Sequence, residues 1–187
     1  MRLIFLGPPG AGKGTQAAIL ANLWQIPHIS TGDILRQAIA GKTSLGIQAK
    51  AHVDAGELVP NILVMAMIRE RFGQRDTEKG WILDGFPRNI SQADALDQLL
   101  QIMRQPYGFA VNFTVPTDIL VERMLGRGRQ DDNEAIIRRR LEVYHEQTAP
   151  LIEFYQRRQC LKTIDANLPV EQVTNRLQES LRQPVEV

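Results

Sequence analysis

The chain has 187 residues, enough for one domain with a substantial core, and its 43% hydrophobic and 23% charged content is ordinary for a globular protein. A formal net charge of +1 argues against a broad nucleic-acid or membrane-binding surface, and no apolar run comes near the ~18 residues of a membrane span. The one cysteine, Cys160, excludes an internal disulfide and a multi-cysteine zinc site, so we expect a buried or half-buried thiol in a cytoplasmic protein.

Apolar strand patterns alternate with helical patterns along the chain. The first strand is expected at 2–6, followed by a glycine-rich loop at 7–12 and a helix from about residue 13 to 24. Further strands are predicted at 27–30, 81–85, 109–115 and 161–165, and further helices near 61–73, 91–103, 117–126, 133–157 and 169–182. Because each strand leads into a helix, the pattern predicts an α/β fold with a five-stranded parallel sheet and helices on both faces.

Residues 31–60 break this alternation. The segment has helical spacing throughout, contains no strand pattern, and carries glycines at positions 32, 41, 46 and 56. This composition indicates a small helical insertion, over about 30–59, that can move against the sheet. An ordinary helical hairpin is the alternative.

The loop after the first strand reads GPPGAGKGT, and Gly7, Gly12 and Lys13 match the phosphate-binding pattern G-x-x-x-x-G-K-[ST]. Glycines let backbone N–H groups turn inward around a phosphate, and the helix that follows directs its positive end at the same point. Position 14 departs from the pattern, since Gly14 stands where a hydroxyl is expected and Thr15 follows it. The strand–loop–helix context nevertheless predicts a nucleotide site.

Basic residues are mostly arginines, 17 against five lysines, and six of them fall between positions 123 and 140. The guanidinium fork suits phosphate oxygens, so this local concentration favours a small anionic ligand over a polymer. Arg123 and Arg127 are four residues apart and share one helix face. Arg138, Arg139 and Arg140 point about 100° apart and cannot all serve one site. We expect Arg139 to lie on a solvated face.

The chain lacks the D-x-x-G and N-K-x-D motifs of GTPases. It contains instead STGDILR (30–36), DAGELVP (54–60), WILDGFPRN (81–89) with Gln92, VERMLGRGRQDD (121–132) and IIRRRLEVYHEQTAPLIEFY (136–155). With GPPGAGKGT, these segments resemble the adenylate kinase family from the first strand to the last. In that family a glycine follows the P-loop lysine and the hydroxyl comes next, so Gly14 and Thr15 have the family form.

The resemblance implies a P-loop three-layer fold and reversible transfer of a phosphoryl group from ATP to AMP with Mg²⁺. The implied catalytic residues are Lys13, Arg88, Arg123, Arg129 and Arg140. The implied ATP site comprises Gly10, Ala11, Gly12, Lys13, Gly14, Thr15, Arg127 and Leu168. The implied AMP site comprises Thr31, Arg36, Glu57, Leu58, Val59, Gly85, Phe86, Pro87, Arg88, Gln92, Arg129 and Arg140. Asp84 is implied to orient Mg²⁺ through water.

The chemistry of this reaction explains why arginines dominate. The accepting phosphate is already largely ionised near neutral pH, because its second pKa is about 6, so no general base is required. His28, His52 and His145 therefore need no catalytic role. Charge neutralisation and alignment are what the reaction demands, and arginines, one lysine and Mg²⁺ supply both.

The sequence departs from many bacterial relatives at the lid. A small domain, sometimes holding zinc, is commonly inserted between the segments of Arg127 and Arg129, whereas only Gly128 stands there in this chain. We expect one kinase domain, 1–187, with a short lid loop at 126–132 and no zinc site. Asp131 and Asp132 are either hinge carboxylates that pair with arginines or an N-cap for the following helix.

Two further positions and two rival functions stay open. Arg138 is a mild candidate for the site. Leu168 stands where a polar or basic residue is common in the family, and the difference is harmless if only the Leu168 carbonyl contacts the base.

The first rival function is a UMP/CMP-type kinase, which shares the P-loop and GFPRN, although Thr31 favours AMP. The second is a catalytically silent regulator, which would be expected to lack some of the lysine and arginine residues named above. With both nucleotide sites in one chain we expect a monomer, without nucleic-acid or membrane partners.

Overall fold

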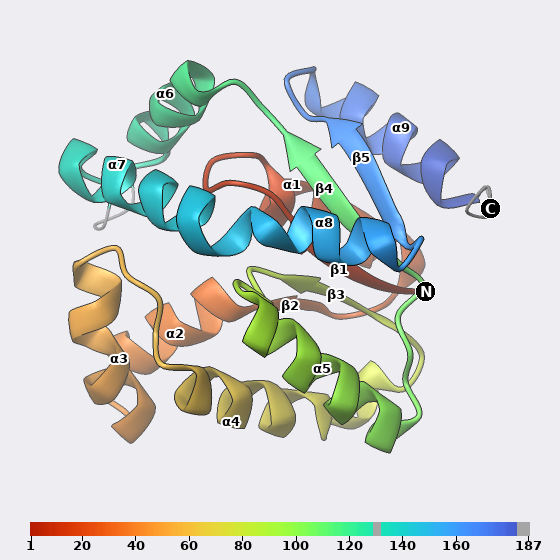
Figure 1. Cartoon of the computed structure of the whole chain (residues 1–187), viewed down its shortest axis with the longest axis horizontal. Coiled ribbons are helices and arrows are strands. Elements are labelled where there is room, and N and C mark those ends of the chain that lie inside the picture. The colour runs from red at the N-terminus through yellow and green to blue at the C-terminus, as the bar shows by residue number, and fades with distance from the viewer. Residues whose placement is uncertain (129–131, 183–187) are drawn as a thin grey trace.

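The computed structural model describes residues 1–128 and 132–182, and its centre is a parallel sheet (Figure 1). The strands lie in the order β2 (His28–Ser30), β3 (Trp81–Asp84), β1 (Arg2–Leu6), β4 (Phe109–Thr114) and β5 (Leu161–Asp165). All five predicted strands are present and parallel, so the predicted fold class is confirmed. The chain first fills one side of β1 and then the other, which makes the end of β1 the switch point where such sheets bind ligands.

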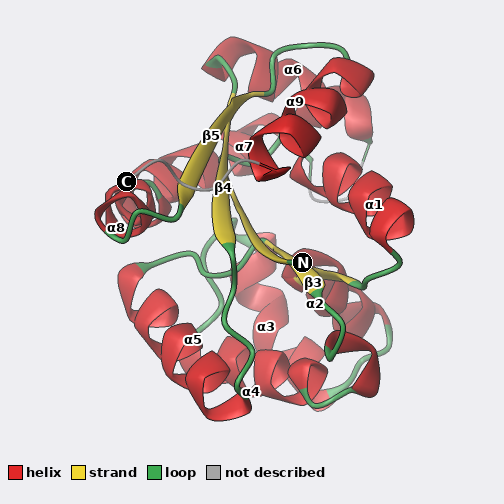
Figure 2. Cartoon of the chain, turned by 90° about the vertical axis from the view of Figure 1, so that its right-hand side faces the viewer, coloured by secondary structure: helices red, strands yellow, loops and turns green. Residues whose placement is uncertain are grey.

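Helices cover both faces of the sheet, which Figure 2 shows nearly edge-on. One layer consists of α1 (Lys13–Trp24), α6 (Thr117–Arg127), α7 (Glu134–Val143) and α9 (Val170–Arg182). The other consists of α4 (Asn61–Phe72), α5 (Ile90–Met103) and α8 (Pro150–Arg157). Side chains of β1 alternate between the layers: Leu3 and Phe5 enter the first core, and Ile4 and Leu6 the second. A strand buried on both faces needs such a continuous apolar run.

The predicted insertion is a pair of helices, α2 (Thr31–Ala40) and α3 (Ser44–Asp54), below the sheet edge in Figure 1. The hydroxyl of Ser30 caps α2 by accepting from Asp33 N, and that of Thr43 caps α3 by accepting from Gly46 N. At Gly46 the two helices approach so closely that a Cβ would lie 2.0 Å from the carbonyl oxygen of Ala38. Sequence patterning therefore identified both the helical character and the absence of a strand.

The prediction of one continuous α-helix over 133–157 is wrong. The segment consists of α7, a π-helical segment η2 (Tyr144–Thr148) and α8. Pro150 has no N–H to continue the i→i−4 ladder, and the preceding Ala149 N–H bonds to the carbonyl of Tyr144 at 2.8 Å, five residues back. This wider turn lets the Thr148 hydroxyl donate to the Arg88 carbonyl at 2.8 Å.

Two smaller observations complete the fold. A 3₁₀ segment, η1 (Arg75–Thr77), which the sequence patterns did not indicate, connects α4 to β3. The Cys160 thiol is half-buried, as expected. Within 1–128 and 132–182, no helix is both long enough and apolar enough to cross a membrane.

We expect Gly46→Ala to destabilise the protein, because its methyl group would overlap the backbone of α2. Overpacking against backbone should lower the free energy of unfolding by about 3 kcal/mol, or roughly 6–12 °C in Tm for a chain of this size. Thermal unfolding followed by circular dichroism measures the change. Gly126→Ala is the matched control, since a Cβ there meets nothing within 4 Å; equal Tm values for the two variants would contradict the prediction.

Candidate active site

A cleft of about 880 Å³ opens at the carboxyl ends of the central strands, where parallel α/β sheets bind their ligands. The glycine-rich loop after β1 forms one wall, and the helical insertion with the β3–α5 turn forms the opposite wall. Side chains of α6 and α7 and the turn after β5 close the cleft between them. Segments far apart in the sequence thus meet at one edge of the sheet.

The glycine-rich loop has the backbone that its sequence predicts. Gly7, Gly10 and Gly12 have φ angles of 135°, 86° and 86°, which side-chain-bearing residues rarely adopt. At Gly7 a Cβ would lie 2.7 Å from the carbonyl of Phe113 on β4, so the close packing of two strands also requires glycine. The loop then delivers the chain into α1, whose first residue is Lys13.

Lys13 folds back over this loop. Its ammonium donates to the carbonyls of Gly7 at 2.7 Å and Pro8 at 2.8 Å. Burial lowers the pKa of Lys13 to about 8; the nearby Asp84 carboxylate opposes that shift, and the charges of Arg88 and Arg127 add to it. A negatively charged ligand beside Lys13 would favour its protonated form.

Gly14 lies beside Asp84: a Cβ at this position would be 3.4 Å from Asp84 Oδ2, an ordinary van der Waals contact. Thr15 lines the cleft one residue later. Asp84 ends β3 and is only 9% exposed.

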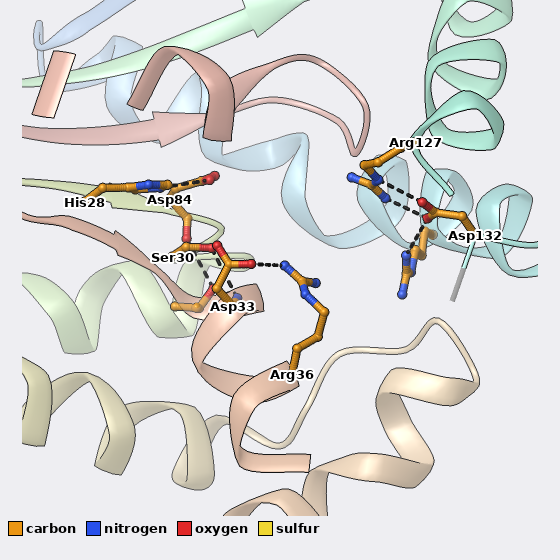
Figure 3. Close-up of polar contacts among 9 residues, drawn as sticks. His28, Ser30, Asp33, Arg36, Asp84, Arg127 and Asp132 are labelled. Carbon is orange, nitrogen blue, oxygen red and sulfur yellow. Dashed lines mark hydrogen bonds and ion pairs between the residues drawn. The ribbon is translucent and has the colours of Figure 1, made fainter. Parts of the chain in front are cut away.

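His28 lies against Asp84, a neighbour that the sequence did not indicate. Its Nε2 is 3.3 Å from Asp84 Oδ2, and the two side chains point at each other in Figure 3. The parallel pairing of β2 with β3 sets Ser30 beside Asp84 and brings His28 to the same edge. Only the strand order reveals this contact, because 55 residues separate the pair along the chain.

Arg88 and Arg36 project from the acceptor wall of the cleft. Arg88 Nε donates to the Gly85 carbonyl at 2.8 Å, and Arg36 pairs with Asp33 one turn earlier on α2 (Figure 3). Burial lowers the pKa of Arg88. The Asp84 carboxylate opposes this shift, and the positive charges of Arg140 and Arg36 add to it. Both arginines line the cleft.

Arg127 and Arg140 converge on Asp132 from α6 and α7. Arg127 binds both carboxylate oxygens, at 2.8 and 2.6 Å, and Arg140 Nη1 lies 3.6 Å from Oδ1 (Figure 3). Asp132 is 1% exposed in its side chain. Of the two alternatives left open for it, arginine pairing is the one observed, because Asn133 caps α7 instead. Arg129 and Asp131 lie outside the described residues.

The three remaining arginines of this region divide between cleft and surface. Arg123 lines the cleft and donates to the Ala166 carbonyl at 3.1 Å, whereas Arg138 pairs with Glu134 on an exposed face of α7. Arg139 keeps 39% of its side chain exposed, as expected for a solvated face, and it also forms two ion pairs. Its Nε donates to Glu57 at 2.7 Å and its Nη1 donates to Glu142 at 3.1 Å, so this arginine joins the insertion to α7.

The acceptor wall also contains a hydrogen-bond network around Gln92. Gln92 is 2% exposed; its Oε1 accepts from Arg88 N at 2.7 Å and its Nε2 donates to Asn61 Oδ1 at 2.8 Å. At the turn, Gly85 has φ 79°, and a Cβ there would lie 2.8 Å from the Thr31 hydroxyl. Asn61 had no sequence motif to mark it.

With the exception of Arg129, the structure brings every site residue expected from the sequence into this one cleft. They are Gly10, Ala11, Gly12, Lys13, Gly14, Thr15, Thr31, Arg36, Glu57, Leu58, Val59, Asp84, Gly85, Phe86, Pro87, Arg88, Gln92, Arg123, Arg127, Arg140 and Leu168. In the described part of the chain, no three His, Cys, Asp or Glu side chains gather as a metal site would require.

Comparison with known proteins agrees with this geometry. The family model for adenylate kinase matches residues 5–160. The chain is 56% identical to "Adenylate kinase 1" of Nostoc sp., an alignment covering 96% of this chain and 98% of that protein. It is 54% identical to "Adenylate kinase 1" of Synechocystis sp. (96% of each chain) and 51% identical to "Adenylate kinase" of Corynebacterium urealyticum (93% and 95%). The chain belongs to the adenylate kinase family.

Proposed function

We propose that this chain catalyses the reversible, Mg²⁺-dependent transfer of the terminal phosphoryl group of ATP to AMP, giving two molecules of ADP. Family membership makes it a phosphotransferase, and one observation carries the assignment of both substrates. Six cations line a single cleft, and they come from the glycine-rich loop, the insertion, the β3–α5 turn, α6 and α7. They are Lys13, Arg36, Arg88, Arg123, Arg127 and Arg140. A cleft with cations on two opposite walls suits two phosphate chains that meet in the middle.

ATP is assigned to the wall formed by the glycine-rich loop. Backbone N–H groups of residues 10–15 surround its phosphates at the start of α1, with the Lys13 ammonium alongside. Arg127 and Leu168, which line the same side of the cleft, would flank the base. The backbone carbonyl at position 168 can accept a hydrogen bond from a base, whichever side chain the residue carries. Leucine in place of the more common polar or basic residue is therefore compatible with adenine.

AMP is assigned to the opposite wall. Arg36 and Arg88, which both line the cleft, grip its phosphate, because two guanidinium forks satisfy several phosphate oxygens at once. Thr31, the 57–59 segment and Gln92 would enclose the adenine. The insertion at 30–59 therefore serves as the monophosphate-binding subdomain of the single domain 1–187.

The residues present fit a magnesium ion that arrives with its nucleotide. Mg²⁺ keeps most of its waters and takes one or two carboxylates plus substrate phosphates, and Asp84, with Thr15 nearby, provides that kind of partial site. Bound with the ATP phosphates, Mg²⁺ neutralises part of their charge. Asp84 would hold the ion through water, and His28, whose Nε2 lies 3.3 Å from Asp84 Oδ2, would keep that carboxylate in orientation.

Phosphoryl transfer then needs alignment and charge stabilisation from the protein. An oxygen of the AMP phosphate forms a bond to the γ-phosphorus, and the bond from that phosphorus to the β–γ bridging oxygen breaks, which leaves the electron pair on ADP. Lys13, Arg123 and Arg140 offset the charge that spreads over the transferring group. No base acts, because the attacking oxygen is already ionised.

Lid, assembly and cellular location follow as parts of the proposal. The short lid loop at 126–132 would cover ATP, and Arg127 and Asp132, which lie near its two ends, pair with each other. A monomer is sufficient, because both assigned nucleotide sites lie in one chain. A free thiol on Cys160 suits the reducing cytoplasm.

ADP formation from ATP and a second nucleotide, followed by a coupled assay, tests the function directly. With AMP, CMP, UMP and GMP compared at equal concentration, we expect AMP to give the highest kcat/KM. Turnover with none of the four would exclude the enzyme and favour a catalytically silent regulator. Preference for UMP or CMP would assign the chain to the pyrimidine-type kinases.

Lys13→Met should lower kcat by about 100- to 1,000-fold, the usual loss when one group that stabilises transition-state charge is removed. Methionine fills a similar volume without the ammonium, so the fold should persist. Steady-state kinetics measure the loss, and a thermal melt serves as the control for folding. A kcat within about twofold of the parent protein would remove Lys13 from the mechanism.

Arg88→Lys should lower kcat/KM for AMP by about 10- to 100-fold, because an ammonium cannot reproduce the bidentate grip on phosphate. The KM for ATP should change much less. Arg138→Lys is the matched control, since Arg138 pairs with Glu134 on an exposed surface away from the cleft. Equal kcat/KM values for AMP in the two variants would refute the role of Arg88.

A further inference from the structure

Three side-chain amides form a chain of hydrogen bonds behind the acceptor wall. Gln92 Nε2 donates to Asn61 Oδ1 at 2.8 Å, and Asn89 Nδ2 donates to the same oxygen at 3.3 Å. Asn61 Nδ2 in turn lies 3.5 Å from the Ser91 hydroxyl. Asn61 is the first residue of α4, and the other three belong to the start of α5; Figure 1 shows the two helices side by side.

Two backbone donors determine the direction of every amide in this chain. Arg88 N–H can only donate, so the Gln92 atom 2.7 Å away is the oxygen. Gln92 N–H likewise requires the oxygen of Asn89, at 2.9 Å. Both amides must then turn an NH₂ group to Asn61, and the atom of Asn61 that receives them is its oxygen. The orientation of the Gln92 amide is thus set by its surroundings.

Gln92 retains one hydrogen and one lone pair for a ligand. An amide nitrogen carries two hydrogens and an amide oxygen carries two lone pairs. Asn61 accepts one hydrogen of Gln92 Nε2, and the Arg88 N–H occupies one lone pair of Gln92 Oε1. Gln92 lines the cleft on the acceptor side. It therefore presents a donor and an acceptor side by side, in an order that cannot be reversed without breaking hydrogen bonds.

This order distinguishes two kinds of purine. A 6-aminopurine has a donor at N6 beside an acceptor at N1, which complements the oxygen and nitrogen of Gln92. A 6-oxopurine has an acceptor at O6 beside a donor at N1, which sets like groups against each other. To accept it, Gln92 would have to rotate its amide by about 180°, which turns its NH₂ toward Arg88 N–H and its oxygen toward Asn61 Oδ1.

We propose that Asn61 is a specificity-determining positioning residue: by accepting from Gln92 Nε2 it acts with the Arg88 N–H to oppose rotation of the amide, and so disfavours 6-oxopurine monophosphates in the acceptor site. This inference rests on the proposed function, in which Gln92 faces the acceptor base. Asn61 does not touch the base. It acts through Gln92, and its amide oxygen is the group that matters.

The test compares AMP with IMP, which differ only in the 6-substituent and in the hydrogen that the 6-oxopurine carries on N1. For the parent protein, Asn61→Leu, Asn61→Asp and Gln92→Ala, we would measure kcat/KM for each monophosphate and its Kd by titration calorimetry. Asn61 is exposed, so the substitutions should leave the fold intact. Asn175→Leu, an exposed position on α9, is the matched control for the same change of side chain.

We expect Asn61→Leu to narrow the AMP-to-IMP ratio about tenfold, the effect of one hydrogen bond. Asn61→Asp keeps the accepting oxygen and should restore the parent ratio, while Gln92→Ala should narrow it at least as far as Asn61→Leu. A residue that merely supported the start of α4 would lower both kcat/KM values in parallel. An unchanged ratio in Asn61→Leu or in Gln92→Ala would therefore overturn the inference.

The binding measurements separate this inference from the proposed function. A parent protein that prefers AMP over IMP in binding but forms no ADP would contradict the proposed function, while the Kd ratios of the variants would still decide the role of Asn61. A parent protein that forms ADP from AMP while Asn61→Leu retains the parent ratio would leave the proposed function intact and remove Asn61 from it.

Discussion

Mutual repulsion among cations at one edge of the sheet is the constraint on which the rest of the structure depends. The cations concerned are Lys13, Arg36, Arg88, Arg123, Arg127 and Arg140. The chain offsets them with the carboxylates of Asp33, Asp84 and Asp132, and Figure 3 shows these acids paired within the site. Burial lowers the pKa of Lys13 to about 8, and the positive charges of Arg88 and Arg127 add to that shift. Polyanionic substrates supply the missing negative charge, so binding and relief of repulsion are one event.

These charged side chains are held in place by loops and turns that pack closely against neighbouring segments. Glycines make this close approach possible. Gly7 lets the loop pack on β4, and Gly85 lets the turn after β3 approach the Thr31 hydroxyl. Carbonyl groups then orient the cations directly, as Gly85 does for Arg88 and Ala166 does for Arg123. A charge fixed by the main chain needs little reorganisation during transfer, which is how preorganised sites lower a barrier.

The acceptor side is held by contacts between elements that the sequence separates widely. Glu57 in the loop after α3 binds Arg139 on α7, and Thr148 in the π-helical segment binds the carbonyl of Arg88. Asn61 binds Gln92 across the start of α4 and α5. The first contact joins the insertion to α7, and the other two hold the β3–α5 turn and the start of α5. Packing between separate elements therefore supports the residues that line the acceptor side of the cleft.

The sequence by itself determined the sheet class, the phosphate loop, the helical insertion and the inventory of arginines, because apolar periodicity, glycine placement and charge are local properties that distant packing does not alter. Only the tertiary structure decided the contact of His28 with Asp84, the choice of arginine pairing for Asp132, the attachment of Arg139 to Glu57 and the network at Asn61. It also divided the expected helix over 133–157 where Pro150 removes a donor. Each of these depends on which strands and helices become neighbours, and that is set by the sum of contacts made across the whole chain.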